Sequence, residues 1–139
     1  MNSLRILIID DELAIRQVLA AELRREDYTV DDVGDGETAL EYLLTDEIDI
    51  AICDVRMPGI SGVDVLRKVR EAGIDTSFLL MTAFASVDTA IESMKLGAFD
   101  YLVKPVRSEE VLHQIRQIAD MRGLRDENRR LRQIVLGDQ

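Results

Sequence analysis

Four short apolar runs, separated by longer stretches of mixed character, constrain the fold of this chain most. They are Leu4–Ile9, Ile48–Cys53, Phe78–Met81 and Tyr101–Val103. A strand with one face in water would alternate apolar and polar residues, whereas these runs are apolar at almost every position and too short for buried helices. They are therefore predicted to be parallel strands that are covered on both faces.

The stretches between the runs have features of helices. Apolar residues recur at helical spacing in the first and third of them. A weaker run, Tyr28–Val33, contains Asp31 and Asp32 and is predicted to be an edge strand. Ser108 is predicted as the N-cap of the last helix. Helices are expected over 13–23, 37–44, 63–69, 86–96 and from Ser108 onward. This alternation predicts an α/β sheet with helices on both faces.

Composition narrows the class of protein. A length of 139 residues suits one domain. The chain has 17 Lys and Arg against 27 Asp and Glu, a net charge of −10, which argues against binding to nucleic acid or anionic lipid. Its single Cys excludes an internal disulfide. The first apolar run ends at Asp10, so it is neither a signal peptide nor a membrane span, and a cytoplasmic protein is expected.

A polar residue follows each buried run. Parallel strands end at the same edge of a sheet, where ligands bind in this class of fold. The residues predicted to meet there are Asp10, Asp11, Asp54, Thr82 and Lys104.

The residue types indicate the chemistry of this edge. Three carboxylates close together either keep protons, with raised pKa values, or bind a cation. Oxygen ligands favour Mg²⁺, and Cys53 precedes Asp54 on the strand and so faces the other way. Lys104 is expected to pair with Asp54 at rest and with a phosphoryl oxygen when one is present. Asp11 has an alternative role as a helix N-cap.

Together these motifs resemble the receiver domain of two-component response regulators. The resemblance covers about residues 4–120. It is carried by Asp10-Asp11, by Asp54 followed by Met57-Pro58-Gly59, by Thr82-Ala83 and by Lys104-Pro105. It implies a flavodoxin-like, doubly wound, five-stranded parallel sheet in the order 2-1-3-4-5. It also implies that a sensor histidine kinase phosphorylates Asp54, in a domain that promotes this reaction and its reversal and is not an enzyme in its own right.

The same resemblance implies roles for the other site residues. Asp11, Asp54 and the backbone carbonyl of Arg56 would ligate Mg²⁺, with Asp10 acting largely through water. Lys104 would hold a phosphoryl oxygen through a cis Lys104-Pro105 loop.

Two residues would report the switch that the resemblance implies. Thr82 would move toward the phosphoryl group. Tyr101 would turn from an exposed to a buried position.

The segment after residue 120 has a different pattern. The chain is divided into a receiver domain, 1–120, and a helical linker, 121–139. A heptad repeat places five residues at a and d positions: Met121, Leu124, Asn128, Leu131 and Val135. About two heptads favour a parallel coiled-coil homodimer. The segment also resembles the linker of sigma-54-dependent, NtrC-type activators, which implies ATPase and DNA-binding domains downstream in the full-length chain.

Three other functions fit parts of the pattern. A haloacid-dehalogenase-like phosphatase also uses an Asp nucleophile and Mg²⁺, but it places a second acid where this chain has Arg56. A nucleotide or flavin module would need a Gly-rich loop after the first strand, which is missing. A dimerisation module with a vestigial acidic site is the third.

Overall fold

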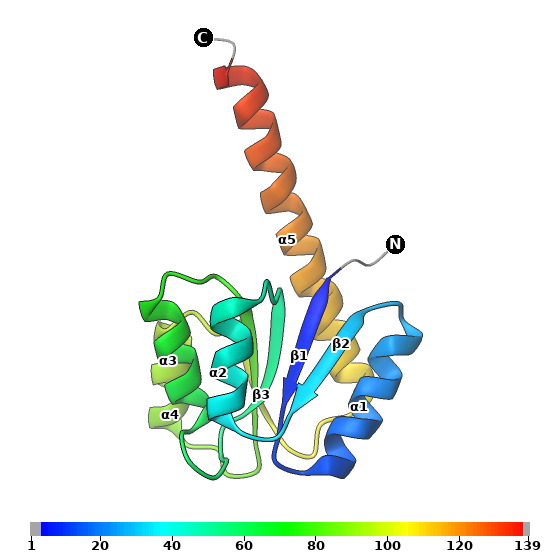
Figure 1. Cartoon of the computed structure of the whole chain (residues 1–139), viewed down its shortest axis with the longest axis vertical. Helices are drawn as coiled ribbons and strands as arrows, with labels where there is room; N and C mark the ends of the chain where they lie inside the picture. The colour runs from blue at the N-terminus through cyan, green and yellow to red at the C-terminus, as the bar shows by residue number, and fades with distance from the viewer. Residues whose placement is uncertain (1–3, 138–139) are drawn as a thin grey trace.

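The computed structural model describes residues 4–137, which form one parallel sheet with helices on both faces (Figure 1). The order of its strands is β2-β1-β3-β4-β5, as expected. The strands are β1 (Arg5–Ile9), β2 (Thr29–Val33), β3 (Ile50–Asp54), β4 (Ser77–Thr82) and β5 (Asp100–Val103). The helices are α1 (Leu13–Arg25), α2 (Gly36–Thr45), α3 (Gly62–Glu71), α4 (Val87–Lys95) and α5 (Ser108–Gly137).

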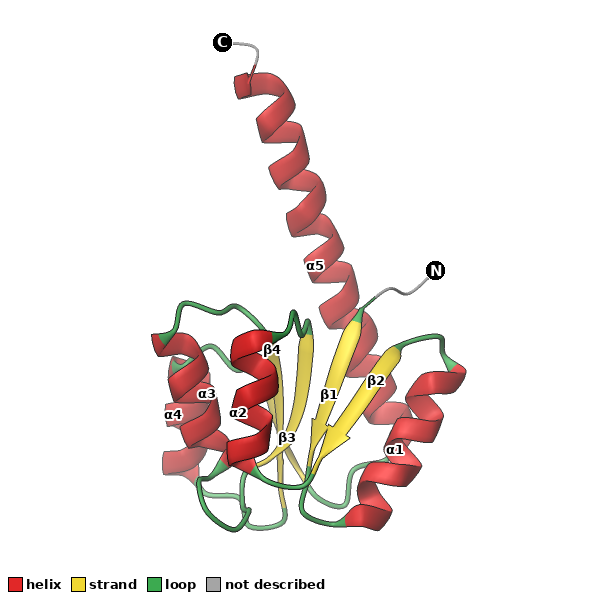
Figure 2. Ribbon diagram, viewed as in Figure 1, coloured by secondary structure: helices red, strands yellow, loops and turns green. Residues whose placement is uncertain are grey.

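The sheet separates two apolar cores. Ile6 and Ile8 of β1 pack with α1 and α5, whereas Leu7 and Ile9 pack with α2 and α3. Figure 2 shows these helices on opposite sides of the strands. Successive side chains of a strand enter opposite cores, which is why the strand sequences are apolar without alternation.

Some boundaries differ from the predicted ones. Strand β3 begins at Ile50 rather than Ile48 and extends to include Asp54. Ile48 is apolar because it is buried in the loop before the strand. The N-cap prediction for Ser108 is wrong. Helix α5 begins at that residue, and the carbonyl of Arg107 accepts the first helical hydrogen bond, from Val111.

Helix α5 is the longest element, with 30 residues. It runs without interruption across the predicted domain boundary at residue 120, and its second half projects beyond the sheet (Figure 1). Residues 138 and 139 of the predicted linker lie outside the described residues. Within residues 4–137, no helix has the length and hydropathy required to span a bilayer.

Two glycines with open surroundings provide a test of these backbone assignments. Gly73 has φ +76° in the turn after α3, whereas Gly123 lies inside α5, and a Cβ at either would meet nothing within 4 Å. We expect Gly73→Ala to lower the free energy of unfolding by about 1–2 kcal/mol, since the left-handed conformation disfavours a side chain. Gly123→Ala should raise it by about 0.5–1 kcal/mol. Urea denaturation measures both, and changes of equal sign would contradict the assignments.

Candidate functional site

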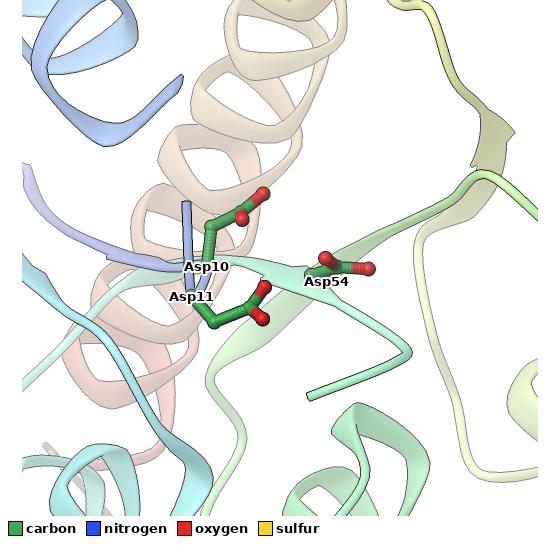
Figure 3. A group of neighbouring side chains, drawn as sticks. All are labelled: Asp10, Asp11 and Asp54. Carbon is green, nitrogen blue, oxygen red and sulfur yellow. The ribbon is translucent and has the colours of Figure 1, made fainter. Parts of the chain in front are cut away.

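The five predicted polar residues do meet at the carboxyl edge of the sheet. One carboxylate oxygen from each of Asp10, Asp11 and Asp54 lies within 4.8 Å of the others. Figure 3 shows the three side chains beside one another, with the carboxyl group of Asp11 directed toward Asp54. Asp10 and Asp54 are buried and Asp11 is exposed, so the cluster is reached from the Asp11 side. Its donors are all carboxylate oxygens, which suits Mg²⁺.

Lys104 joins two of these carboxylates. Its Nζ donates to Asp10 Oδ2 at 2.8 Å and to Asp54 Oδ2 at 3.1 Å. The expected pairing with Asp54 is confirmed, and the shorter bond to Asp10 was not anticipated. The Lys104-Pro105 peptide is cis, as expected. One ammonium group thus opposes three carboxylates, which leaves an excess of negative charge at the site.

Burial and charge shift the titration of this pair. Burial raises the pKa of the Asp54 carboxyl above its usual value, and the hydrogen bond from Lys104 only partly opposes that effect. For Lys104, burial alone would lower the pKa, but the bonds to Asp10 and Asp54 outweigh it and raise the pKa. The lysine therefore stays charged, while the ionised form of Asp54 is disfavoured where no further cation is present.

The N-cap alternative for Asp11 is wrong. Glu12 holds the cap position of α1, and its side chain makes no capping bond. Asp10 Oδ1 accepts the backbone N–H of Glu12 at 2.9 Å, a bond that shapes the turn before α1 but does not cap the helix. Among the described residues, the Asp11 carboxylate has no hydrogen bond or ion pair, and it is therefore available as a ligand.

Arg16 of α1 also supports the site, although the sequence analysis did not identify it. Its Nη1 donates to the backbone carbonyl of Asp10 at 2.7 Å, and its Nε donates to Asp32 Oδ2 at 2.8 Å. Asp32 belongs to the edge strand β2, so the arginine fixes the end of β1 against its neighbour. A single arginine on a helix has no sequence pattern that would predict this contact.

Two loops meet above Asp54. Asp54 Oδ1 accepts the backbone N–H of Arg56 at 3.2 Å, and Thr82 Oγ1 accepts that of Phe84 at 3.1 Å. The Arg56 guanidinium lies 4.8 Å from the centroid of the Phe84 ring, a cation–π contact between the loops. The Thr82 hydroxyl is thus engaged with its own loop.

Tyr101 lies on β5, half-buried against the core formed with α2 and α3. Its hydroxyl is buried and, within residues 4–137, has no hydrogen-bond partner. The hydroxyl is therefore already buried in this structure, whereas the resemblance implies an exposed resting position for this side chain.

Comparison with known proteins decides the family. Residues 6–116 match the model of the response regulator receiver domain. This chain is a response regulator receiver. Receivers are signalling modules of two-component systems rather than enzymes in the usual sense.

Similar proteins include several transcriptional regulators. The receiver is 38% identical over 113 residues to the transcriptional regulatory protein DltR of Streptococcus agalactiae, covering 81% of this chain and 50% of that one. It is 33% identical over 131 residues to the regulatory protein AtoC of Escherichia coli, covering 94% of this chain and 28% of that one. The receiver therefore spans half the length, or less, of these two relatives.

Solved receivers have the same fold. The signal receiver domain of a putative Luxo repressor protein from Vibrio parahaemolyticus superposes with a TM-score of 0.85 at 27% identity, covering 89% of this chain and 95% of that one. A CheY-like receiver domain protein from Methanospirillum hungatei gives a TM-score of 0.83 at 26% identity, covering 89% and 99%. The order of the strands and the flavodoxin-like fold implied by the motifs are thereby confirmed.

The raised pKa of Asp54 makes a prediction about stability in metal-free buffer. A carboxyl with a higher pKa in the folded state binds more protons there, so its contribution to stability falls as pH rises through the interval above 3.8. Asp54→Asn should therefore raise the free energy of unfolding at neutral pH, and the gain should disappear as pH falls below that interval.

Asp64 provides a control of opposite sign. Its bond to Arg67 lowers the pKa of this half-buried carboxyl. Asp64→Asn should slightly lower the free energy of unfolding at neutral pH, with the loss disappearing as pH falls. Urea denaturation at several pH values measures both variants, and a destabilising Asp54→Asn would contradict the burial argument.

Proposed function

We propose that this receiver accepts a phosphoryl group on Asp54 from a phosphohistidine of a sensor histidine kinase, in a Mg²⁺-dependent reaction. The observation that carries the proposal is the contact of Lys104 with Asp54 beside two further carboxylates. A carboxylate oxygen of Asp54 attacks phosphorus in line, the P–N bond breaks, and its electron pair leaves with the histidine nitrogen. The product is an acyl phosphate on Asp54.

The other site residues serve the charge of this product. Asp11, Asp54 and the backbone carbonyl of Arg56 would hold Mg²⁺, with Asp10 largely through water. The ion would neutralise phosphoryl oxygens. Lys104 moves from the Asp54 carboxylate to a phosphoryl oxygen, so its charge is kept but its partner changes.

Thr82 and Tyr101 act as the switch. Thr82 exchanges its bond with Phe84 for one with a phosphoryl oxygen, which pulls the loop after β4 inward. Tyr101 would turn between an exposed position and the buried one seen here, and its buried hydroxyl has no hydrogen bond among the described residues that would resist this turn. Loop movement at the site thereby changes the surface around α4 and β5.

An apolar groove beside the site suits the kinase. It has a volume of about 580 Å³ and runs between α1 and the loop after β5, with Lys104 in its wall. Its lining includes Ala14, Ile15, Val18, Pro105 and Val106. A helix that carries the phosphohistidine would place its apolar face here.

The second half of α5 suits dimerisation and output. Leu124, Leu131 and Val135 are 72%, 51% and 63% exposed. These a and d residues would be buried by the same helix of a second copy, in the parallel coiled coil that the heptads predict. The match to AtoC covers 94% of the chain and so extends into this segment. We propose that the receiver regulates ATPase and DNA-binding domains of a sigma-54-type activator in the full-length chain.

The alternatives have less support. A phosphatase of the dehalogenase type would need an acid in place of Arg56, whose guanidinium instead stacks on Phe84. A vestigial site would not need Lys104 held between Asp10 and Asp54.

Phosphorylation of Asp54 can be tested with a small phosphodonor. Incubation with Mg²⁺ and acetyl phosphate should add one phosphoryl group, detected by intact-protein mass spectrometry, and EDTA should abolish the adduct. Asp54→Asn should form none. Asp46→Asn is the matched control, since Asp46 pairs with Arg5 at the opposite edge of the sheet and should leave the yield unchanged. An adduct that survives Asp54→Asn would refute the assignment.

The dimer can be tested by adding one charge either at the a and d positions of α5, here called the seam, or away from them. Leu131→Asp introduces a carboxylate at a d position and should shift sedimentation to the monomer, because a buried unpaired charge costs several kcal/mol. Gln133→Asp introduces the same charge at an outward-facing position and should have no effect. A chain that sediments as a monomer without any substitution would contradict the coiled coil.

A further inference from the structure

Helix α5 contacts the sheet through a stripe whose chemistry changes along its length. Val111, Ile115 and Ile118 are buried in the core shared with α1. Continued at the same helical spacing, the stripe reaches Arg122 and Arg125 instead of apolar residues. The last contacts of α5 with the domain are therefore made by arginines and not by apolar side chains.

Arg122 is held by a set of fixed acceptors. Its Nη1 donates to Ser77 Oγ at 3.0 Å and to the Asp75 carbonyl at 3.2 Å. Its Nη2 lies 3.6 Å from Asp49 Oδ1 and 3.6 Å from Asp75 Oδ1. The Arg122 side chain is only 13% exposed, so its contacts with Ser77 and Asp49 are less screened by solvent than the contact with the exposed Asp75 carboxylate. Such a planar, multidentate contact defines both the position and the rotation of the helix.

The acceptors belong to the amino-terminal edge of the sheet. Asp49 Oδ2 accepts the backbone N–H of Arg5 at 2.9 Å, and the Asp49 carbonyl accepts that of Ser77 at 2.9 Å. These bonds connect the first residues of β1 and β4 to the loop before β3. Arg122 thus contacts β4 directly and is linked to β1 through Asp49 in the loop before β3.

The attachment ends one turn later. Arg125 reaches Asp75 at 3.5 Å through an exposed contact, and from there to Gly137 the described helix makes no hydrogen bond or ion pair with another element. The physical boundary between the domain and the free helix therefore falls near residue 125, not at residue 120.

The attachment also sets which face of the helix is free. On a helical wheel, Arg125 lies about a quarter turn from the centre of the a and d residues, and Arg122 lies more than a third of a turn from it. On that free side, Met121, Leu124 and Asn128 line a groove with Phe99, next to the edge strand β5.

We propose that Arg122 is a positioning residue that fixes the direction and rotation of the emerging helix, so that its apolar seam faces a second copy on the β5 side. The link to a second copy rests on the proposed dimer, whereas the orientation of the helix within one chain does not. The seam and the receiver then form one rigid unit as far as Arg125, and a free helix follows.

The orientation is measured within one chain. Spin labels are attached to Glu41→Cys in α2 and Gln133→Cys in α5, since both positions are exposed, while burial protects Cys53 from the reagent. Labelled protein is diluted in an excess of unlabelled protein, and the distance distribution is recorded by pulsed electron paramagnetic resonance. We expect one narrow distribution without further substitution and one at least twice as wide with Arg122→Gln.

Two further variants sharpen the test. Arg129 lies on the same side of α5, two turns after Arg122, and has no hydrogen bond or ion pair among residues 4–137. Arg129→Gln should therefore leave the width of the distance distribution unchanged. Arg122→Lys keeps the charge but cannot reach Ser77 and Asp49 together, and an intermediate width is expected. It also serves if Arg122→Gln does not fold.

The results separate the two claims. An unbroadened distribution in folded Arg122→Gln, or equal broadening in Arg129→Gln, would overturn the positioning role. Sedimentation of the labelled protein that keeps Arg122 tests the dimer. If this protein is a monomer, the dimer proposal is contradicted, but the distance measurement still decides the positioning role of Arg122.

Discussion

The ammonium group of Lys104 lies between the carboxylates of Asp10 and Asp54, and the arrangement of the site depends on this contact. It joins the loop after β5 to the ends of β1 and β3. One positive charge does not balance three carboxylates, so burial still disfavours the ionised form of Asp54. This unmatched negative charge beside a lysine is the feature on which the proposed binding of a cation and a phosphoryl group rests. The charges of the resting site thus already favour the binding of a positive ion.

The sheet gives its two edges different tasks. At the carboxyl edge, the loops after β3 and β4 are held by a few polar contacts, such as the bond between Thr82 and Phe84 and the stacking of Arg56 on Phe84. Such loops rearrange more easily than the packed core. At the amino edge, Arg122 attaches α5 to Ser77 of β4 and to Asp49 in the loop before β3. Both edges are joined by strands buried on two faces, which deform little. Under the proposed phosphorylation of Asp54, the loops rather than the sheet would therefore rearrange.

The strands and the site were predictable for the same reason. Parallel strands covered on both faces need uninterrupted apolar runs, and the polar residue after each run must lie at one edge. Asp54, Thr82 and Lys104 were located in this way. Predictions that depended on local preference alone were less reliable. Asp11 and Ser108 are good N-cap residues by type, yet Glu12 and Arg107 hold those positions, since strand and loop geometry sets where each helix begins.

The sequence by itself determined the class of fold and the five residues at the carboxyl edge, because both follow from the apolar runs and from the polar residue that comes after each run. Tertiary structure alone decided the partners of the long charged side chains. Lys104 bonds to Asp10 across 94 residues, Arg16 supports the end of β1, and Arg122 bonds to Ser77 across 45 residues. A flexible cationic side chain can reach many acceptors, and only the packing of the core decides which carboxylates and carbonyls are brought within its range.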